Sequence, residues 1–321
     1  MPGRCTSATL LALLAMSAGA AAQQYPTRPV RIIVPTTAGS ANDYTARALG
    51  QRMTEAFGQQ MVIDNRAGAS GVIAHEITAH AAPDGYTLVF STSSALTINP
   101  LLYKVPYDPK RDFAPVALGS VNPQMLFAHP GVPAKNVSEL IALAKAKPGA
   151  LNCASPGNGT ANHLGCEMLK AMANLNYVHV PYKGTTPAVT DVVGGQMHFM
   201  FNSIPGVLPL ARSGKVRALG TGGLKRSAAT PDVPAIAETL PGFEIVTWYA
   251  MMAPAATPKP IIARVNAEIV KSFADPAFAQ RMIDLGSEPV SSTPEGMTQH
   301  LKKEHDRWSK FIKMAGLKTE R

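Results

Sequence analysis

The fold is decided by the stretch VRIIVPTTAGSAND at residues 30–43. Its first five residues include four β-branched ones, and this predicts a buried strand over 30–34. The loop from Pro35 to Ser40 is rich in turn-forming residues, and a helix is expected from Asn42 to Phe57, with Gly58 as its stop. A strand, a short loop and a helix make the first half of a βαβ unit, so this stretch predicts a parallel sheet.

The same alternation continues along the chain. Strands are expected at 61–64 and 86–90 with a helix at 70–82, which completes a first α/β unit. A second unit has strands at 151–154, 177–180, 197–201 and 216–221 and helices at 138–146, 160–173 and 187–193. Strands at 116–121, 125–128 and 244–252 connect the units, and helices at 258–273, 276–285 and 294–314 end the chain. We therefore expect an α/β protein with two lobes, 23–122 with 244–321 and 123–243, hinged where the connecting strands cross.

Residues 1–22 differ in character from the rest of the chain. Arg4 precedes a short apolar run at 8–16, and small residues follow at 17–22. This is the pattern of a secretory signal peptide. A membrane anchor is the alternative, but the run is shorter than the ~20 apolar residues that a spanning helix needs. We expect the chain to be exported to the periplasm without these residues.

Export bears on the three cysteines. Cys5 lies in the leader, so the mature chain keeps Cys153 and Cys166, which either form a disulfide or remain as two buried thiols. His163 is close to them in sequence, but zinc needs further ligands at a suitable spacing. No metal site is predicted.

Charge and loop composition both indicate a small anion as ligand. The chain carries a net charge of +9, but no basic stripe with interleaved aromatic residues, which argues against nucleic acid. The loops 35–43 and 155–163 each join a strand to a helix and offer hydroxyls and free helix N–H groups. The run STSS at 91–94 is a third loop of this kind. Ordinary turn chemistry is the alternative for each loop, but their pairing at the carboxyl ends of parallel strands favours a ligand site.

Enzyme signatures are missing from the sequence. It contains no G-x-S-x-G elbow, P-loop or H-E-x-x-H, and GNG at 157–159 lacks the third glycine of a dinucleotide fingerprint. We therefore expect a binding protein with no catalytic residues and no cofactor. The alternative is an exported α/β hydrolase acting on an ester, because a Ser/His/Asp set can be assembled from distant positions.

An ordered series of short motifs covers almost the whole mature chain. The motifs are YPTRPVRIIVP (25–35), NRAGA (65–69), PDGYTL (83–88), NPLLY (99–103), GNGT (157–160) with HL (163–164), VPYKG (180–184), GKVRAL (214–219) and PDVP (231–234). In this series the chain resembles the Bug-type extracytoplasmic solute receptors, the periplasmic binding components of tripartite tricarboxylate transporters.

The resemblance implies a type II, Venus-flytrap periplasmic binding protein that holds a small carboxylate between its lobes. It also implies delivery of that ligand to a membrane permease, and we expect the protein to act as a monomer. Carried over by position, the ligand-binding roles fall on Thr36, Thr37, Ser40, Ala41, Asn42 and Asp43 in the first lobe and on Ser155, Gly159, Thr160 and His163 in the second. Thr92 and Ser93 join them from the third loop.

Three positions depart from the family pattern and bear on the ligand. Ser40 replaces the second glycine of a usual pair, and Thr36 stands where an aromatic residue is common. Asn202 occupies a position often held by Asp, so an amide replaces the carboxylate that would balance an ammonium group. Asp43 is the remaining counter-ion, but it falls in the first turn of a helix. We expect a carboxylate without an amino group: a dicarboxylate, a tricarboxylate or an aromatic acid.

Overall fold

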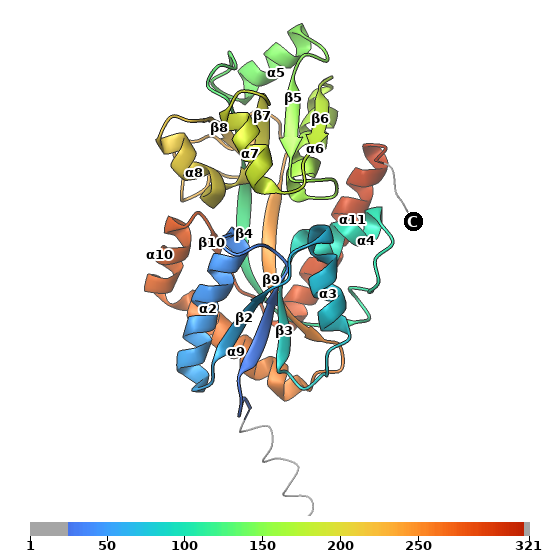
Figure 1. The fold of residues 1–321 in the computed structure, drawn as a ribbon, viewed down its shortest axis with the longest axis vertical. Helices are drawn as coiled ribbons and strands as arrows, with labels where there is room; N and C mark the ends of the chain where they lie inside the picture. Colours follow the sequence, from blue (N-terminus) through green and yellow to red (C-terminus); the bar gives the residue numbers. More distant parts are fainter. Residues whose placement is uncertain (1–24, 318–321) are drawn as a thin grey trace, which may run out of the picture.

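The computed structural model describes residues 25–317, and the expected leader at 1–22 lies outside them. Within the described range, no helix is both long and apolar enough to cross a membrane. The strands form one mixed sheet in the order β2-β1-β3-β9-β4-β7-β5-β6, with β8 and β10 (Glu288–Pro289) also paired to β4. Helices cover this sheet in two groups, which are the two lobes of the molecule (Figure 1).

The lower lobe in Figure 1 is built on three parallel strands, β1 (Val30–Val34), β2 (Met61–Asn65) and β3 (Thr87–Thr92). Its helices are α2 (Ala41–Phe57), α3 (Val72–Ala79), α9 (Lys259–Ala274) and α10 (Pro276–Asp284). Ile32 and Ile33 are both fully buried, and they belong to different apolar clusters on the two faces of the sheet. Since helices cover both faces, residues 30–34 are nearly all apolar instead of alternating with polar ones.

The upper lobe repeats this plan with β5 (Asn152–Ser155) between β6 (Val178–Pro181) and β7 (Phe199–Ser203), all parallel. Its helices are α5 (Val137–Ala146), α6 (Ala161–Ala173), α7 (Thr185–Val193) and α8 (Ile204–Arg212). Phe199 and Phe201 pack into one apolar cluster, and Met200 packs into another. The expected α/β architecture with two lobes is confirmed.

Two long antiparallel strands, β4 (Phe113–Ala128) and β9 (Val246–Pro254), run between the lobes (Figure 1). β9 pairs with β3 of the lower lobe, while the last part of β4 pairs with β7 and with β8 (Arg217–Thr221) of the upper lobe. The sequence predicted a break at Asn122-Pro123, but β4 is continuous. Pairing with β7 begins only at Gln124, so Pro123 removes no hydrogen bond from that side of the ladder.

Several helices differ from the expectation. The helix expected at 70–82 is a 3₁₀ turn, η1 (Ala69–Gly71), followed by α3. Helix α8 was not predicted, because Pro205 and Pro209 give its sequence the character of a turn. The π-helical segment η2 (Ser94–Ile98) and α4 (Asn99–Leu102) follow β3, where a loop was expected.

The C-terminal helix α11 (Pro294–Met314) has the predicted bounds. Its N-cap is Thr293, whose Oγ1 accepts a hydrogen bond from the backbone N–H of Gly296 at 3.0 Å. Trp308, Phe311 and Ile312 in its last turns pack, together with residues of α4, into an apolar cluster of the upper lobe. The end of α11 thus extends from the lower lobe onto the upper one (Figure 1).

Candidate functional site

The loop after β1 ends in a capped helix. The Oγ of Ser40 accepts a hydrogen bond from the backbone N–H of Asp43 at 3.2 Å, which makes Ser40 the N-cap of α2. The hydroxyls of Thr36 and Ser40 lie 2.7 Å apart, so they hydrogen-bond to each other. Gly39 has φ +80°, a conformation that glycine adopts without strain. The loop therefore presents hydroxyls at the positive end of the α2 dipole.

The loop after β5 is built in the same way. The Oγ1 of Thr160 accepts from the backbone N–H of His163 at 3.3 Å and donates to the carbonyl of Gly157 at 2.8 Å. Thr160 is thus the N-cap of α6. Its hydroxyl has a partner on both sides, so it fixes the loop as well as the helix end.

Both caps line one cavity of about 210 Å³ that takes residues from both lobes. Four helices present their first residues to it: α2 through Ser40 and Ala41, α6 through Thr160 and Ala161, α7 through Thr185, and α8 through Ser203. The orphan N–H groups and the positive dipole end of each helix favour a negative charge in the cavity. No Asp, Glu, Lys, Arg or His stands among the described residues that line it.

Seven of the residues expected from the sequence line this cavity: Thr36, Ser40, Ala41, Asn42, Thr92, Thr160 and Asn202. The remaining lining residues were not predicted: Pro35, Ser70, Ser94, Gln124, Pro156, Ala161, Asn162, Thr185, Ser203, Thr247 and Tyr249. Five of them stand in the loops that the sequence did single out: Pro35, Ser94, Pro156, Ala161 and Asn162. Gln124, Thr247 and Tyr249 lie on the crossing strands, where no local pattern marks a polar residue as part of a site.

One donor in the cavity wall has no partner among the residues that the structure describes. The side chain of Asn42 is only 1 % exposed, and its Nδ2 makes no hydrogen bond with any described residue. Its Oδ1 accepts from the hydroxyl of Thr36 at 3.3 Å, which leaves the amide nitrogen as the free end. An unpaired buried donor costs about 1–3 kcal/mol, and a ligand oxygen would relieve that cost.

A group of amides forms the part of the wall next to the crossing strands. The Nδ2 of Asn162 donates to the carbonyl of Phe201 at 2.7 Å and also approaches Gln124 Oε1 and Asn202 Oδ1, at 3.3 and 3.4 Å. The Nε2 of Gln124 donates to Thr247 Oγ1 at 3.0 Å. These bonds join β4, β7, β9 and α6, and they orient Asn202 so that its Nδ2 is the group able to donate to a ligand.

Six expected residues do not line the cavity. Thr37 is exposed, and Ser93 is buried after β3. Asp43 is buried between α2 and β2, where its carboxylate accepts from Gly39, Arg47 and Asn65. Burial alone would raise the pKa of Asp43, but these hydrogen bonds outweigh it and lower that pKa. The carboxylate of Asp43 is thus used inside the fold and is not free to balance a charge on a ligand.

Ser155, Gly159 and His163 also have their polar groups engaged within the upper lobe. Ser155 is 0 % exposed, and its Oγ lies 2.7 Å from Nε2 of His179. The backbone N–H of Gly159 donates to Nδ1 of His163 at 3.2 Å. Local sequence placed these residues in the right loop, but the rings of His163 and His179 pack against each other, with their centroids 4.3 Å apart, and neither lines the cavity.

The Ser155–His179 contact bears on the hydrolase alternative. A serine and a histidine at hydrogen-bond distance are two parts of a nucleophilic triad. However, Ser155 is fully buried, and its hydroxyl is also within reach of the backbone N–H and carbonyl of Gly157, at 3.2 and 3.3 Å. A nucleophile must be reachable by its substrate, and this hydroxyl is enclosed in its own loop. The contact therefore favours a structural role for Ser155.

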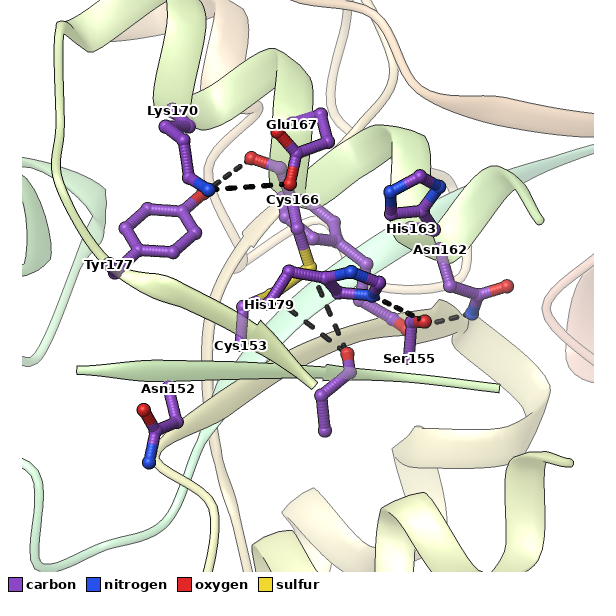
Figure 2. The surroundings of a disulfide bond; sticks show 12 residues. Asn152, Cys153, Ser155, Asn162, His163, Cys166, Glu167, Lys170, Tyr177 and His179 are labelled. Carbon is purple, nitrogen blue, oxygen red and sulfur yellow. Dashed lines mark hydrogen bonds and ion pairs between the residues drawn. A yellow bond between two sulfur atoms is a disulfide. The ribbon is translucent and has the colours of Figure 1, made fainter. Parts of the chain in front are cut away.

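Cys153 and Cys166 form a disulfide that joins β5 to α6 (Figure 2). Beside it lie His163, Glu167 and His179, each offering a ligand atom within 4.8 Å of the others. Burial lowers the pKa of His163 to about 4, and Lys170 adds to the effect. Burial, with His163 and Lys170 nearby, lowers the pKa of His179 to about 3. The sequence missed this group, because His179 comes from a different element.

A second cavity, of about 600 Å³, lies between the segment 96–110 and α11. It contains none of the residues expected from the sequence, and its wall includes Lys104, Asp108 and Lys110. Although it is larger, no two helix N-termini meet among its described lining residues. The smaller cavity between the lobes is the better candidate for an anion site.

Comparisons with known proteins identify the family and support the two-lobe fold. Residues 45–317 match the family model described as tripartite tricarboxylate transporter family receptor. The protein BugT of Bordetella pertussis is 35 % identical over 97 % of this chain and 96 % of its own. Among solved structures, an R. palustris protein with adipate has a TM-score of 0.87 and 34 % identity, covering 91 % of this chain and 98 % of its own. MatC from Rhodopseudomonas palustris with bound malate has a TM-score of 0.81 and 33 % identity, covering 90 % and 100 %.

Proposed function

The chain belongs to the tripartite tricarboxylate transporter receptor family of solute-binding proteins, and we propose that it captures a small carboxylate in the cavity between its lobes. The observation that carries this proposal is the buried Nδ2 of Asn42, a donor without a partner among the described residues in the wall of a cavity where four helices begin. A carboxylate supplies the acceptor that Asn42 lacks and the negative charge that the helix dipoles favour.

The ligand we propose carries no ammonium group. The described lining has no carboxylate to pair with an ammonium, and Asp43 is already paired with Arg47. Burying an unpaired ammonium is costly. Dicarboxylates are supported further by the structures of relatives with adipate and with malate. Tricarboxylates and aromatic acids stay in the proposed class, because hydroxyls and amides do not select one carbon skeleton.

The proposed mechanism is closure of two lobes on the ligand. We assign 23–122 and 244–321 to lobe 1 and 123–243 to lobe 2, with β4 and β9 as the hinge. Contacts to Ser40 from one lobe and to Thr160 from the other form together only when the lobes are close, so ligand favours the closed state. We further propose that the protein works in the periplasm, that it is a monomer, and that the closed state is the form delivered to a membrane permease.

Calorimetry with matched ligand pairs tests the ligand class. Succinate is compared with aspartate, and glutarate is compared with glutamate. Citrate and an aromatic acid are added to determine which carbon skeleton the protein prefers. We expect the acid without the amino group to bind more tightly in each pair. A preference for the amino acid in either pair would overturn this ligand class, and no binding of any carboxylate would overturn the proposed function.

The same protein is assayed for ester hydrolysis. We expect no turnover, whereas turnover that disappears in Ser155→Ala would establish the hydrolase instead. Small-angle scattering tests the mechanism: the radius of gyration should fall at saturating ligand, and no change would count against closure from an open state.

A further inference from the structure

Beside the disulfide, α6 and β6 bring two imidazoles and one carboxylate together (Figure 2). His163 and Glu167 are four residues apart on α6, so they share a face of the helix. His179 on β6 lies against them, and all three side chains are half-buried. We propose that His163, Glu167 and His179 form a binding site for one divalent transition-metal ion of the zinc class.

The donor set selects the class of ion. Two imidazole nitrogens and one carboxylate oxygen are a common ligand set for zinc, with a fourth position left for water. Magnesium and calcium prefer six or more oxygen ligands, which this cluster does not offer. Ligands of a tetrahedral zinc ion lie about 3.4 Å apart. The three ligand atoms lie within 4.8 Å of one another, so each pair needs to approach by at most about 1.4 Å, which side-chain rotation supplies.

The scaffold holds these ligands in place. Cys153 is the register partner of His179 in the β5–β6 pair, and Cys166 immediately precedes Glu167. The disulfide therefore links the strand pair that carries His179 to the helical turn that carries Glu167. The Oγ of Ser155 lies 2.7 Å from Nε2 of His179. When Nε2–H donates to that oxygen, the contact orients the ring and leaves the lone pair of Nδ1 for the metal.

Binding of the metal by His163 has a consequence for the neighbouring loop. The backbone N–H of Gly159 donates to Nδ1 of His163, and a neutral imidazole has a single nitrogen with a lone pair. Whichever nitrogen binds the metal, that hydrogen bond must break. Gly159 immediately precedes Thr160, which lines the cavity. The Gly159 amide thus reports occupancy of this site and not of a metal bound elsewhere.

Lys170 acts against the metal. Its Nζ lies 3.4 Å from Oε1 of Glu167, so the ammonium forms an ion pair with one oxygen of the carboxylate. The positive charge of Lys170 also repels a metal cation. Lys170→Met is therefore expected to bind zinc more tightly than the native chain. An affinity that is unchanged or weaker in Lys170→Met would show that Glu167 is not a ligand.

The test is a titration of metal-free mature protein, without a polyhistidine tag, with Zn²⁺ in a calorimeter and with Co²⁺ in a visible spectrometer. His179→Gln keeps an amide donor opposite Ser155 but removes the ligand nitrogen, and Glu167→Gln removes the carboxylate charge. His129→Gln is the control, because this histidine lies outside the cluster. Circular dichroism checks that each variant is folded.

We expect one zinc ion per chain, a shift of the Gly159 amide resonance, and no binding of Mg²⁺. Each ligand variant should weaken zinc at least ~tenfold, with His129→Gln unchanged. Absence of zinc binding would overturn the site. Binding of native strength in His179→Gln or in Glu167→Gln, or an unmoved Gly159 resonance, would overturn the assignment of these three ligands.

Discussion

The side-chain oxygens of Ser40 and Thr160 cap helices of opposite lobes, α2 and α6, and both residues line the same cavity. In each cap the side-chain oxygen accepts a hydrogen bond from the backbone N–H of the third residue after it, which is Asp43 in α2 and His163 in α6. The remaining N–H groups of the first turn have no intrahelical partner. Two such helix ends in one small cavity explain how a site with no charged side chain in its described lining can favour an anion.

The first prediction concerns Asn42. Asn42→Asp replaces the buried donor by a carboxylate, which repels the carboxylate of the ligand. An acidic residue in the first turn of α2 is compatible with the helix, so the variant should fold. Loss of a hydrogen bond to a charged ligand corresponds to about 1.5–3 kcal/mol, so affinity should fall about tenfold to a hundredfold or more. Calorimetry with the preferred carboxylate measures it. Asn158→Asp, an exposed residue outside the cavity lining, is the control. Equal affinities in both variants would remove Asn42 from the site.

Thr160 should affect stability in addition to binding. Its hydroxyl caps α6 and holds the carbonyl of Gly157, so Thr160→Val removes both bonds while it keeps the shape. We expect a loss of about 1 kcal/mol in the free energy of unfolding, and little loss in Thr160→Ser, which keeps the hydroxyl. Urea unfolding of the three proteins measures this. A Thr160→Val protein as stable as the native one would show that the cap is not used.

How far sequence predicts this site depends on the range of the interactions. Ser40 and Thr160 were found because an N-cap and its loop are local, and their chemistry is visible in a few consecutive residues. Gln124 and Thr247 were missed because they meet only when β4 pairs with β9. The strand break expected at Pro123 did not occur, since pairing with β7 begins only at Gln124, one residue later. Tertiary pairing determined these outcomes, and no local signal in the sequence reveals it.

The disulfide offers a stability test that is separate from ligand binding. Cys153 and Cys166 are 13 residues apart, and closing a loop of that length constrains the unfolded chain by about 3 kcal/mol. The free energy of unfolding of the double variant Cys153→Ala/Cys166→Ala should be lower by that amount. The variant should therefore unfold at a lower denaturant concentration than the native chain. Unfolding of the native chain in dithiothreitol provides the comparison. If both measurements equalled the value for the oxidised native protein, the bond would not contribute to stability.

Stability should also fall as the pH is lowered, through His75. This side chain is fully buried, and burial lowers its pKa from the ordinary 6.5 to about 4, although the carbonyl of Gly71 acts in the opposite direction. The unfolded chain takes up a proton near pH 6.5, while the folded chain resists until about pH 4. Folding stability is therefore lost as the pH falls through this window, by roughly 3 kcal/mol.

A variant isolates the contribution of His75. His75→Asn places an amide donor where Nδ1 bonds the Gly71 carbonyl but does not titrate. Its free energy of unfolding should fall less than that of the native chain between pH 7 and pH 4. His80→Asn changes an exposed histidine at the end of the same helix and serves as the control. Equal pH dependence in native chain and His75→Asn would contradict the assignment.

The ligand class can be changed at Asn202. This residue lines the cavity from the end of β7, and its Oδ1 lies 3.4 Å from Nδ2 of Asn162. Asn202→Asp keeps an oxygen opposite Asn162 and adds a negative charge to a wall that has none in its described part. The new carboxylate repels a dicarboxylate and can pair with an ammonium group, so succinate should bind at least ~tenfold more weakly while aspartate loses less or gains. Calorimetry with both ligands on both proteins gives a ratio of affinities, which cancels any general loss from altered folding. An unchanged ratio would show that position 202 does not contact the part of the ligand where an amino group would stand.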